Sequence, residues 1–279
     1  MSLISRRGRT LPWLAVALSL VGCAATTGRP TAVEANLTAK AVGYLDAASV
    51  PASLALVPAP PVAGSAGFAL DEQVSQEARA LRGTPRFSQA THDAELGFPK
   101  GANQFSCAID LDVDAQRTPA LYRLLERSRI DASAATRTAK KHHQRPRPFM
   151  VNGEPTCTPQ DEAGLRRNGS YPSGHTSIGW AWALLLSEIV PDRADAIIAR
   201  GRNYGESRLV CNVHWQSDIL EGRFMGAAAV ARLHDNPAFQ RDLLAARREI
   251  TVARAQGAHS SRDCAAEEAV LKVRPASAL

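Results

Sequence analysis

Aromatic residues and long apolar runs are scarce in this sequence. Phenylalanine, tyrosine and tryptophan make up 5% of its 279 residues, and alanine and leucine dominate the longer segments, which favours helices. The alternation of apolar and polar residues that is typical of strands never persists beyond a few positions, and no internal repeat is present. After the first 22 residues no stretch is long and apolar enough to span a bilayer. These absences argue against a sheet protein, a repeat array and a protein with several membrane spans.

The N-terminus has the features of a targeting segment. Arg6, Arg7 and Arg9 precede an apolar region at 11–21 that is too short to cross a membrane. Leu-Val-Gly before Cys23 resembles a bacterial lipobox, with cleavage before Cys23 and lipid on its sulfur. We therefore predict a lipoprotein signal peptide over 1–22 and a periplasmic or outer-membrane-attached protein. A plain secretory signal cut in the following alanines is the alternative.

Removal of this segment also changes the charge and the cysteine count. It takes away three arginines and no acid, so the formal net charge falls from +6 to +3. A mildly basic chain argues against nucleic acid as a partner. Four cysteines remain, Cys107, Cys157, Cys211 and Cys264. In an exported chain they predict disulfides with three allowed connectivities, and their spacings do not suggest a zinc site.

The pattern along the chain predicts one helical domain with two appendages. Residues 23–57 have little periodicity and indicate a tether and lead-in. The domain is expected over 58–255 and a polar tail over 256–279. Helical spacing of apolar residues predicts helices over 68–81, 86–96, 118–141, 176–189, 194–204, 215–234 and 238–255.

The turn from Gly169 to Thr176 stands out between these helices. Its glycines and proline indicate a turn, and an apolar helical pattern follows directly. Ser173, Gly174 and His175 are therefore expected at a helix N-terminus, where free N–H groups and the helix dipole favour an anion. A helix-capping turn with an incidental histidine is the simpler interpretation.

Two further clusters flank this turn. Lys140 and Arg147 lie at and beyond a predicted helix end, where cations are common for dipole reasons alone. Arg147 stands between two prolines, however, and a rigid guanidinium suits bidentate phosphate binding. His214 and Asp218 are four residues apart and share a face if both lie on a helix. A carboxylate on one ring nitrogen leaves the other free as a nucleophile, and a purely structural His–Asp pair is the alternative.

Taken together, the clusters resemble a known signature. Lys-x6-Arg-Pro, Pro-Ser-Gly-His and Ser-Arg-x5-His-x3-Asp occur in full and in order, from Lys140 to Asp218. This is similar to the type 2 phosphatidic acid phosphatase (PAP2) superfamily, and the residues around each block resemble bacterial class A non-specific acid phosphatases. The resemblance covers roughly residues 57–250.

The resemblance implies an all-α single domain with its active site between the core helices. It implies hydrolysis of small phosphate monoesters through a phosphohistidine, with no metal and no other cofactor. By matched position, the resemblance implies that His214 attacks phosphorus and that Asp218 orients the His214 ring. His175 is then expected to protonate the leaving alcohol. The implied phosphate-binding residues are Lys140, Arg147, Ser173, Gly174 and Arg208.

The same resemblance bears on assembly and on the cysteines. Relatives suggest a homo-oligomer, and contact with a membrane is expected only through the lipid on Cys23. Cys157 and Cys211 flank the predicted active-site segments, so a bridge between them would pin those loops together. Cys107 would then pair with Cys264 or stay free.

Three other functions compete with this one. A vanadium-dependent haloperoxidase shares the phosphate-type pocket, but such enzymes are usually longer. A lipid-phosphate phosphatase acting at the membrane surface is the second alternative, although its membrane relatives have spanning helices between the blocks. The third is an anion-binding surface lipoprotein without activity, which an intact signature makes the weakest of the three.

Overall fold

The structure is a computed structural model that describes residues 41–279, so the predicted signal peptide and Cys23 lie outside the described residues. All regular elements in this part are helices, and it contains no strand, which confirms the all-α class. The α-helices are α2 (Ser53–Leu56), α3 (Ala66–Arg79), α4 (Pro85–His92), α5 (Ser106–Ile109), α6 (Pro119–Ala134), α7 (Arg137–His143), α8 (Pro148–Asn152), α9 (Glu162–Leu165), α10 (Gly174–Ile189), α11 (Ala194–Val210), α12 (Gln216–Leu233), α13 (Pro237–Ala255) and α14 (Cys264–Leu271). Short 3-10 helices span Lys100–Asn103, Pro159–Asp161 and Pro191–Arg193.

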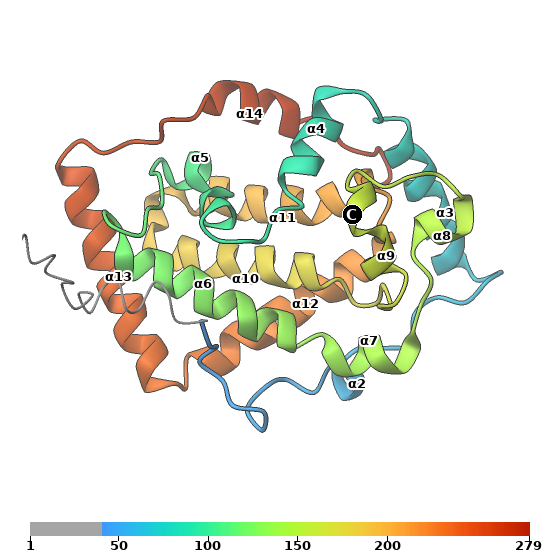
Figure 1. Cartoon of the computed structure of the whole chain (residues 1–279), viewed down its shortest axis with the longest axis horizontal. Helices are drawn as coiled ribbons and strands as arrows, with labels where there is room; N and C mark the ends of the chain where they lie inside the picture. The colour runs from blue at the N-terminus through green and yellow to red at the C-terminus, as the bar shows by residue number, and fades with distance from the viewer. Residues whose placement is uncertain (1–40) are drawn as a thin grey trace, which may run out of the picture. The chain divides into compact units, whose positions relative to one another are not determined.

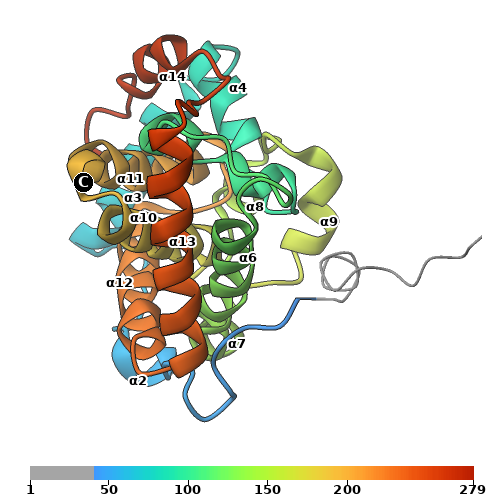
Figure 2. The same cartoon turned by 90° about the vertical axis from the view of Figure 1, so that its left-hand side faces the viewer.

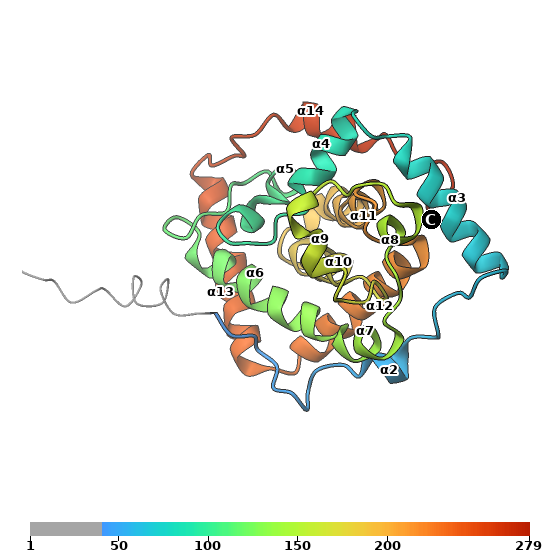
Figure 3. The same ribbon diagram turned by 45° about the vertical axis from the view of Figure 1, so that its right-hand side comes forward.

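Helix α10 is the centre of the bundle. It packs against α11, α12 and α6, and Figure 3 shows these helices around it. Trp182, Leu185 and Leu186 of α10 are fully buried, and the Trp182 indole donates to the Leu125 carbonyl of α6 over 3.0 Å. Helix α13 runs alongside α6 and completes the bundle (Figure 2). The start of α10, which carries the predicted turn, is therefore fixed from several sides.

Glycines allow α12 to approach α10 closely. A Cβ on Gly222 would lie 2.7 Å from the Ser173 carbonyl oxygen, and one on Gly226 would lie 2.5 Å from the Ser177 carbonyl oxygen. Backbone oxygens cannot move aside as a flexible side chain does, so only glycine fits at these two positions. This close packing brings the start of α12 next to the start of α10.

Several helix bounds differ from the sequence-based expectation. The segment expected as one helix over 118–141 breaks into α6 and α7 at Ala135 and Thr136, where the Thr136 hydroxyl donates to the Ser133 carbonyl over 2.9 Å. Such local side-chain bonds compete with the helical ladder. Helix α11 continues to Val210 rather than ending near Tyr204. Gly205 lies inside it because a Cβ there would be 2.9 Å from Thr176, so this glycine serves packing and not termination.

Both ends of the predicted domain also need correction. The lead-in already packs on the core at Tyr44, whose N–H donates to Asp131 and whose hydroxyl donates to Asp242. The residues expected as a polar tail contain α14, which lies across one edge of the bundle in Figure 1. Cys264 is bonded to Cys107, and Glu267 pairs with Arg200 at 3.3 Å. The prediction of a polar tail is wrong for this segment because its polar residues have partners in the domain and do not simply face solvent.

No helix within residues 41–279 combines the length and the apolarity needed to cross a bilayer.

Candidate active site

The three signature blocks converge on one cavity of about 360 Å³. Lys140 comes from α7, Arg147 from the residue before α8, and Arg208 from the last turn of α11. Gly174 and His175 open α10, and His214 lies just before α12. All six residues line the cavity: Lys140, Arg147, Gly174, His175, Arg208 and His214. Segments up to 74 residues apart in the chain thus supply one site.

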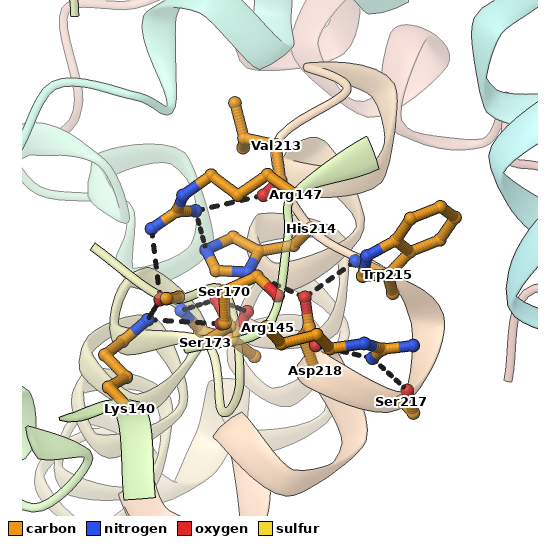
Figure 4. A network of polar contacts seen from close by, with 12 residues as sticks. Lys140, Arg145, Arg147, Ser170, Ser173, Val213, His214, Trp215, Ser217 and Asp218 are labelled. Atoms are coloured by element: carbon orange, nitrogen blue, oxygen red, sulfur yellow. Dashed lines mark hydrogen bonds and ion pairs between the residues drawn. The ribbon is translucent and has the colours of Figure 1, made fainter. Parts of the chain in front are cut away.

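His214 contacts Asp218 as the sequence predicts, but only Asp218 lies on a helix, because His214 precedes the start of α12. Its Nδ1 lies 3.1 Å from Asp218 Oδ2, which also accepts the Trp215 N–H over 2.9 Å (Figure 4). Because a carboxylate accepts, Nδ1 carries the hydrogen and Nε2 keeps its lone pair. Arg147 donates to this Nε2 over 3.1 Å. The Nε2 lone pair therefore accepts a hydrogen bond from a guanidinium that lines the same cavity.

A buried arginine stands behind Asp218. The two terminal nitrogens of Arg145 donate separately, one to Asp218 Oδ1 over 2.8 Å and one to Asp71 Oδ2 over 2.7 Å. Asp71 also accepts from the backbone N–H and the hydroxyl of Ser217, at 2.7 Å each. Figure 4 shows Arg145 reaching from Asp218 towards Ser217. Sequence reasoning missed both Arg145, which lies within the basic cluster, and Asp71, which no local pattern singles out.

Arg147 is held by backbone oxygens as well as by its prolines. Its Nε donates to the carbonyls of Leu165 and Asn168 over 3.1 and 3.2 Å, and one terminal nitrogen donates to Val213 over 3.0 Å. These bonds fix the plane of the guanidinium. Burial lowers the pKa of Arg147 to about 10, with a further contribution from Arg208, so it stays charged near neutrality.

His175 has a simpler environment. It is the second residue of α10, and its Nε2 lies 2.9 Å from the Ala94 carbonyl oxygen. A carbonyl accepts only, so Nε2 carries hydrogen and Nδ1 remains to exchange a proton. The adjacent N–H groups at the helix start are the donors that an anion can use.

Ser173 differs from the role that the signature implies. It is buried and does not line the cavity. Its Oγ accepts from the Thr176 N–H over 3.2 Å and from the Thr176 hydroxyl over 2.9 Å, so it is the N-cap of α10. Its own N–H donates to the Asp218 carbonyl over 2.9 Å. Through these bonds Ser173 positions the helix start against α12.

Lys140 and Arg208 complete the positive lining. Lys140 Nζ donates to the carbonyls of Gly169 and Ser170, over 2.8 and 3.1 Å. Burial, with Arg147 nearby, lowers the pKa of Lys140 to about 7. Burial likewise lowers the pKa of Arg208 to about 10. Arg208 Nε has no partner among the described residues, and one terminal nitrogen reaches only the Cys211 sulfur at 3.6 Å. A buried guanidinium with unused donors is suited to an oxyanion.

The same positive field acts on both histidines. Burial, with Arg147, Lys140 and Arg208, lowers the pKa of His214 well below its ordinary value. Burial, with Arg208 next, also lowers the pKa of His175 well below that value. Both rings are therefore neutral near pH 7 when the cavity holds no anion.

The other candidates fall outside the cavity. Ser207 donates to the buried Asp93 over 2.5 Å, behind the site. His142 and His143 lie on the surface side of α7 and do not line the cavity. Cys157 is bonded to Cys211 with a Cα–Cα separation of 4.7 Å, which joins the loop after α8 to the end of α11. Cys107 pairs with Cys264, which is one of the two alternatives that the sequence left open.

An all-α bundle with a His–Asp pair facing a cavity rich in lysine and arginine defines a phosphate-handling protein. Comparison with known proteins agrees. The profile of the PAP2 superfamily matches residues 130–240. The non-specific acid phosphatase of Providencia stuartii is 45% identical over 207 residues, covering 74% of this chain and 84% of that protein. The acid phosphatase of Zymomonas mobilis is 40% identical over 204 residues, covering 73% and 77%.

A third relative is the non-specific acid phosphatase of Salmonella typhimurium, 40% identical over 195 residues, with 70% of this chain and 78% of that protein covered. The chain therefore belongs to the PAP2 superfamily, as a bacterial class A acid phosphatase.

Proposed function

We propose that the protein hydrolyses phosphate monoesters in two steps, through a phosphohistidine on His214 and without a metal. The observation that carries this proposal is the Nε2 lone pair of His214, which faces the same cavity as Lys140, Arg147 and Arg208. Phosphoryl transfer needs charge stabilisation and in-line placement more than any other contribution from the protein. The three cations and the start of α10 supply the first requirement.

In the first step, His214 Nε2 attacks phosphorus and the bond from phosphorus to the ester oxygen breaks. Arg147 must release Nε2 for this attack, and the bound phosphoryl oxygens take over its donors. Asp218 stabilises the positive charge that develops on the ring. His175, which takes up a proton on Nδ1 when the phosphate dianion binds, gives that proton to the departing oxygen, so the alcohol leaves neutral.

In the second step, water attacks the phosphohistidine and the phosphorus–nitrogen bond breaks. His175 accepts a proton from the water, which restores the state that began the cycle. The bound phosphate dianion opposes the field of the cations, so it raises the proton affinity of His175 relative to the empty cavity. Turnover should therefore be fastest on the acid side of neutrality.

Trapping the intermediate tests this mechanism. Protein mixed with a phosphate-labelled aryl ester and quenched within milliseconds should carry label that is stable in alkali and lost in acid. That label should map to the peptide containing His214, and activity should survive dialysis against a chelator. Absence of a covalent label during rapid turnover, or activity lost to the chelator and restored by a metal, would contradict the proposal.

Export and lipid attachment remain proposals that rest on the N-terminal sequence. Incorporation of labelled palmitate in cells, and its loss in Cys23→Ala, would support them. A soluble, unlabelled wild-type protein would favour the plain secretory signal.

A further inference from the structure

Two cations at the cavity have no part in the proposed reaction. Arg137 and Lys141 both line the cavity that contains His175 and His214, and both side chains are exposed. They are the first and fifth residues of α7. Residues four apart lie on the same helix face, so the two charges are neighbours.

Structural reasons do not account for this pair. Neither cation forms an ion pair or a side-chain hydrogen bond within residues 41–279. Like charges four residues apart destabilise a helix. The helix dipole favours Lys141 in the last turn, but it disfavours Arg137 at the first position. The chain therefore keeps Arg137 next to Lys141 against local helix energetics.

The surrounding lining shows what these charges can bind. In the proposed reaction Lys140, Arg147 and Arg208 bind the reacting phosphoryl group, and no aspartate or glutamate lines the described cavity. The remaining lining is neutral: Leu96, Ser133, Thr136, Gln144, Leu165, Asn168 and Ile178. A volume of about 360 Å³ leaves room for more than one phosphoryl group and lies within the usual range for small-molecule sites.

We propose that Arg137 and Lys141 form a second anion subsite, which binds a second phosphate group carried on the alcohol part of the substrate. The favoured substrates are then bisphosphates in which a short neutral spacer separates the two phosphate groups. This inference rests on the proposed function, because the phosphate-binding residues around His214 fix where the first group lies. The subsite adds binding and leaves the chemistry at His214 unchanged.

Binding of non-hydrolysable analogues tests the subsite directly. Full-length protein is titrated by calorimetry with propane-1,3-bisphosphonate and with propylphosphonate, which differ only in the second anionic group. The wild type should bind the bisphosphonate about tenfold more tightly, beyond the statistical advantage of its two equivalent ends. Exposed ion pairs are each weak, so two together support a factor of this size. The preference should shrink as salt is raised.

A matched pair of double variants isolates the two cations. Arg137→Gln with Lys141→Gln should bind both analogues with similar affinity. Arg241→Gln with Arg248→Gln removes the same charge from the exposed surface of α13, away from the cavity, and should keep the wild-type preference. Circular dichroism spectra that match the wild type would establish that both variants fold.

Three results would overturn the subsite. These are no preference in the wild type, a preference that survives loss of Arg137 and Lys141, or an equal loss of affinity for both analogues. The last result would mean that the two cations act only through the general positive field. The binding test uses phosphonates, which are not hydrolysed, so it does not depend on turnover. A protein that fails to hydrolyse phosphate esters would contradict the proposed function, but the binding preference could still be measured.

Discussion

The two histidines of the site are held in very different ways. His214 is hydrogen-bonded to Asp218. Asp218 accepts a hydrogen bond from Arg145, and Arg145 donates another to Asp71. His175 has one side-chain bond, to the Ala94 carbonyl. A chain of alternating charges orients a ring and stabilises the positive charge that it gains, whereas a carbonyl fixes a tautomer without adding charge. The first arrangement suits a nucleophile, and the second suits a group that gains and loses a proton.

Of the two histidines, His214 should cause the larger loss of activity when it is removed. His214→Ala is expected to lower kcat by about 10⁴-fold or more, because no other group can form the covalent intermediate. The loss should be the same for good and poor leaving groups. Steady-state rates with an aryl and an alkyl phosphate measure it, with a melting curve to exclude unfolding. Retention of most of the activity would show that His214 is not the nucleophile.

Removal of His175 should have a smaller effect that depends on the substrate. His175→Ala is expected to slow the first step, measured as the pre-steady-state release of alcohol, by about 10³-fold on an alkyl phosphate, within the usual contribution of a general acid. With 2,4-dinitrophenyl phosphate the same step should slow by less than about tenfold, since that leaving group needs no proton. Equal losses on the two esters would assign His175 to binding and not to proton transfer.

The site also shows which of its features can be predicted from sequence alone. The spacing of His214 and Asp218 predicts that they are neighbours, and the structure keeps them in contact although only Asp218 lies on the helix. The start of α10 and the positions of Lys140 and Arg147 likewise follow from local turn and helix signals. These features depend on neighbours in sequence, so the residues that specify them lie together in the chain.

Other parts of the site depend on packing between distant segments. Asp71 lies on α3 and meets Arg145 only because α3 packs against the start of α12. Nothing in the local sequence distinguishes it from Glu72 beside it. Ser173 combines both cases, because its capping bond to Thr176 is local whereas its bond to the Asp218 carbonyl depends on the packing of α12 against α10. The local sequence of α14 likewise predicts a tail because its ion-pair partner Arg200 lies far away in sequence.

Neutralising Asp71 tests whether the charges behind His214 matter. In Asp71→Asn, Arg145 keeps Asp218 as its only carboxylate partner, so Asp218 gives less support to the positive charge on His214. We expect kcat to fall about tenfold, equivalent to about 1.4 kcal/mol in the barrier. KM should not change, because Asp71 does not line the cavity.

A second buried carboxylate provides the control. Asp131 accepts the backbone N–H groups of Tyr44 and Leu45 and lies outside the cavity lining. Asp131→Asn should lower the melting temperature and leave kcat unchanged. If Asp71→Asn also alters only the melting temperature, the chain of charges is structural and has no part in positioning His214.

The smallest expected effect concerns Lys140. Its protonation should affect substrate binding, measured as KM, and not the chemical step, measured as kcat. Burial lowers its pKa to about 7, so in the empty cavity Lys140 is charged below pH 7 and neutral above it. The charged form binds phosphate better, and KM should therefore rise about fivefold between pH 6 and pH 8, with Arg147 and Arg208 supplying the remaining attraction. At saturation the bound dianion keeps the proton on Lys140, so this rise should not appear in kcat. Lys140→Arg stays charged throughout, and its KM should be nearly flat over the same range. A KM that rises equally in wild type and Lys140→Arg would assign the pH dependence to the substrate and not to this lysine.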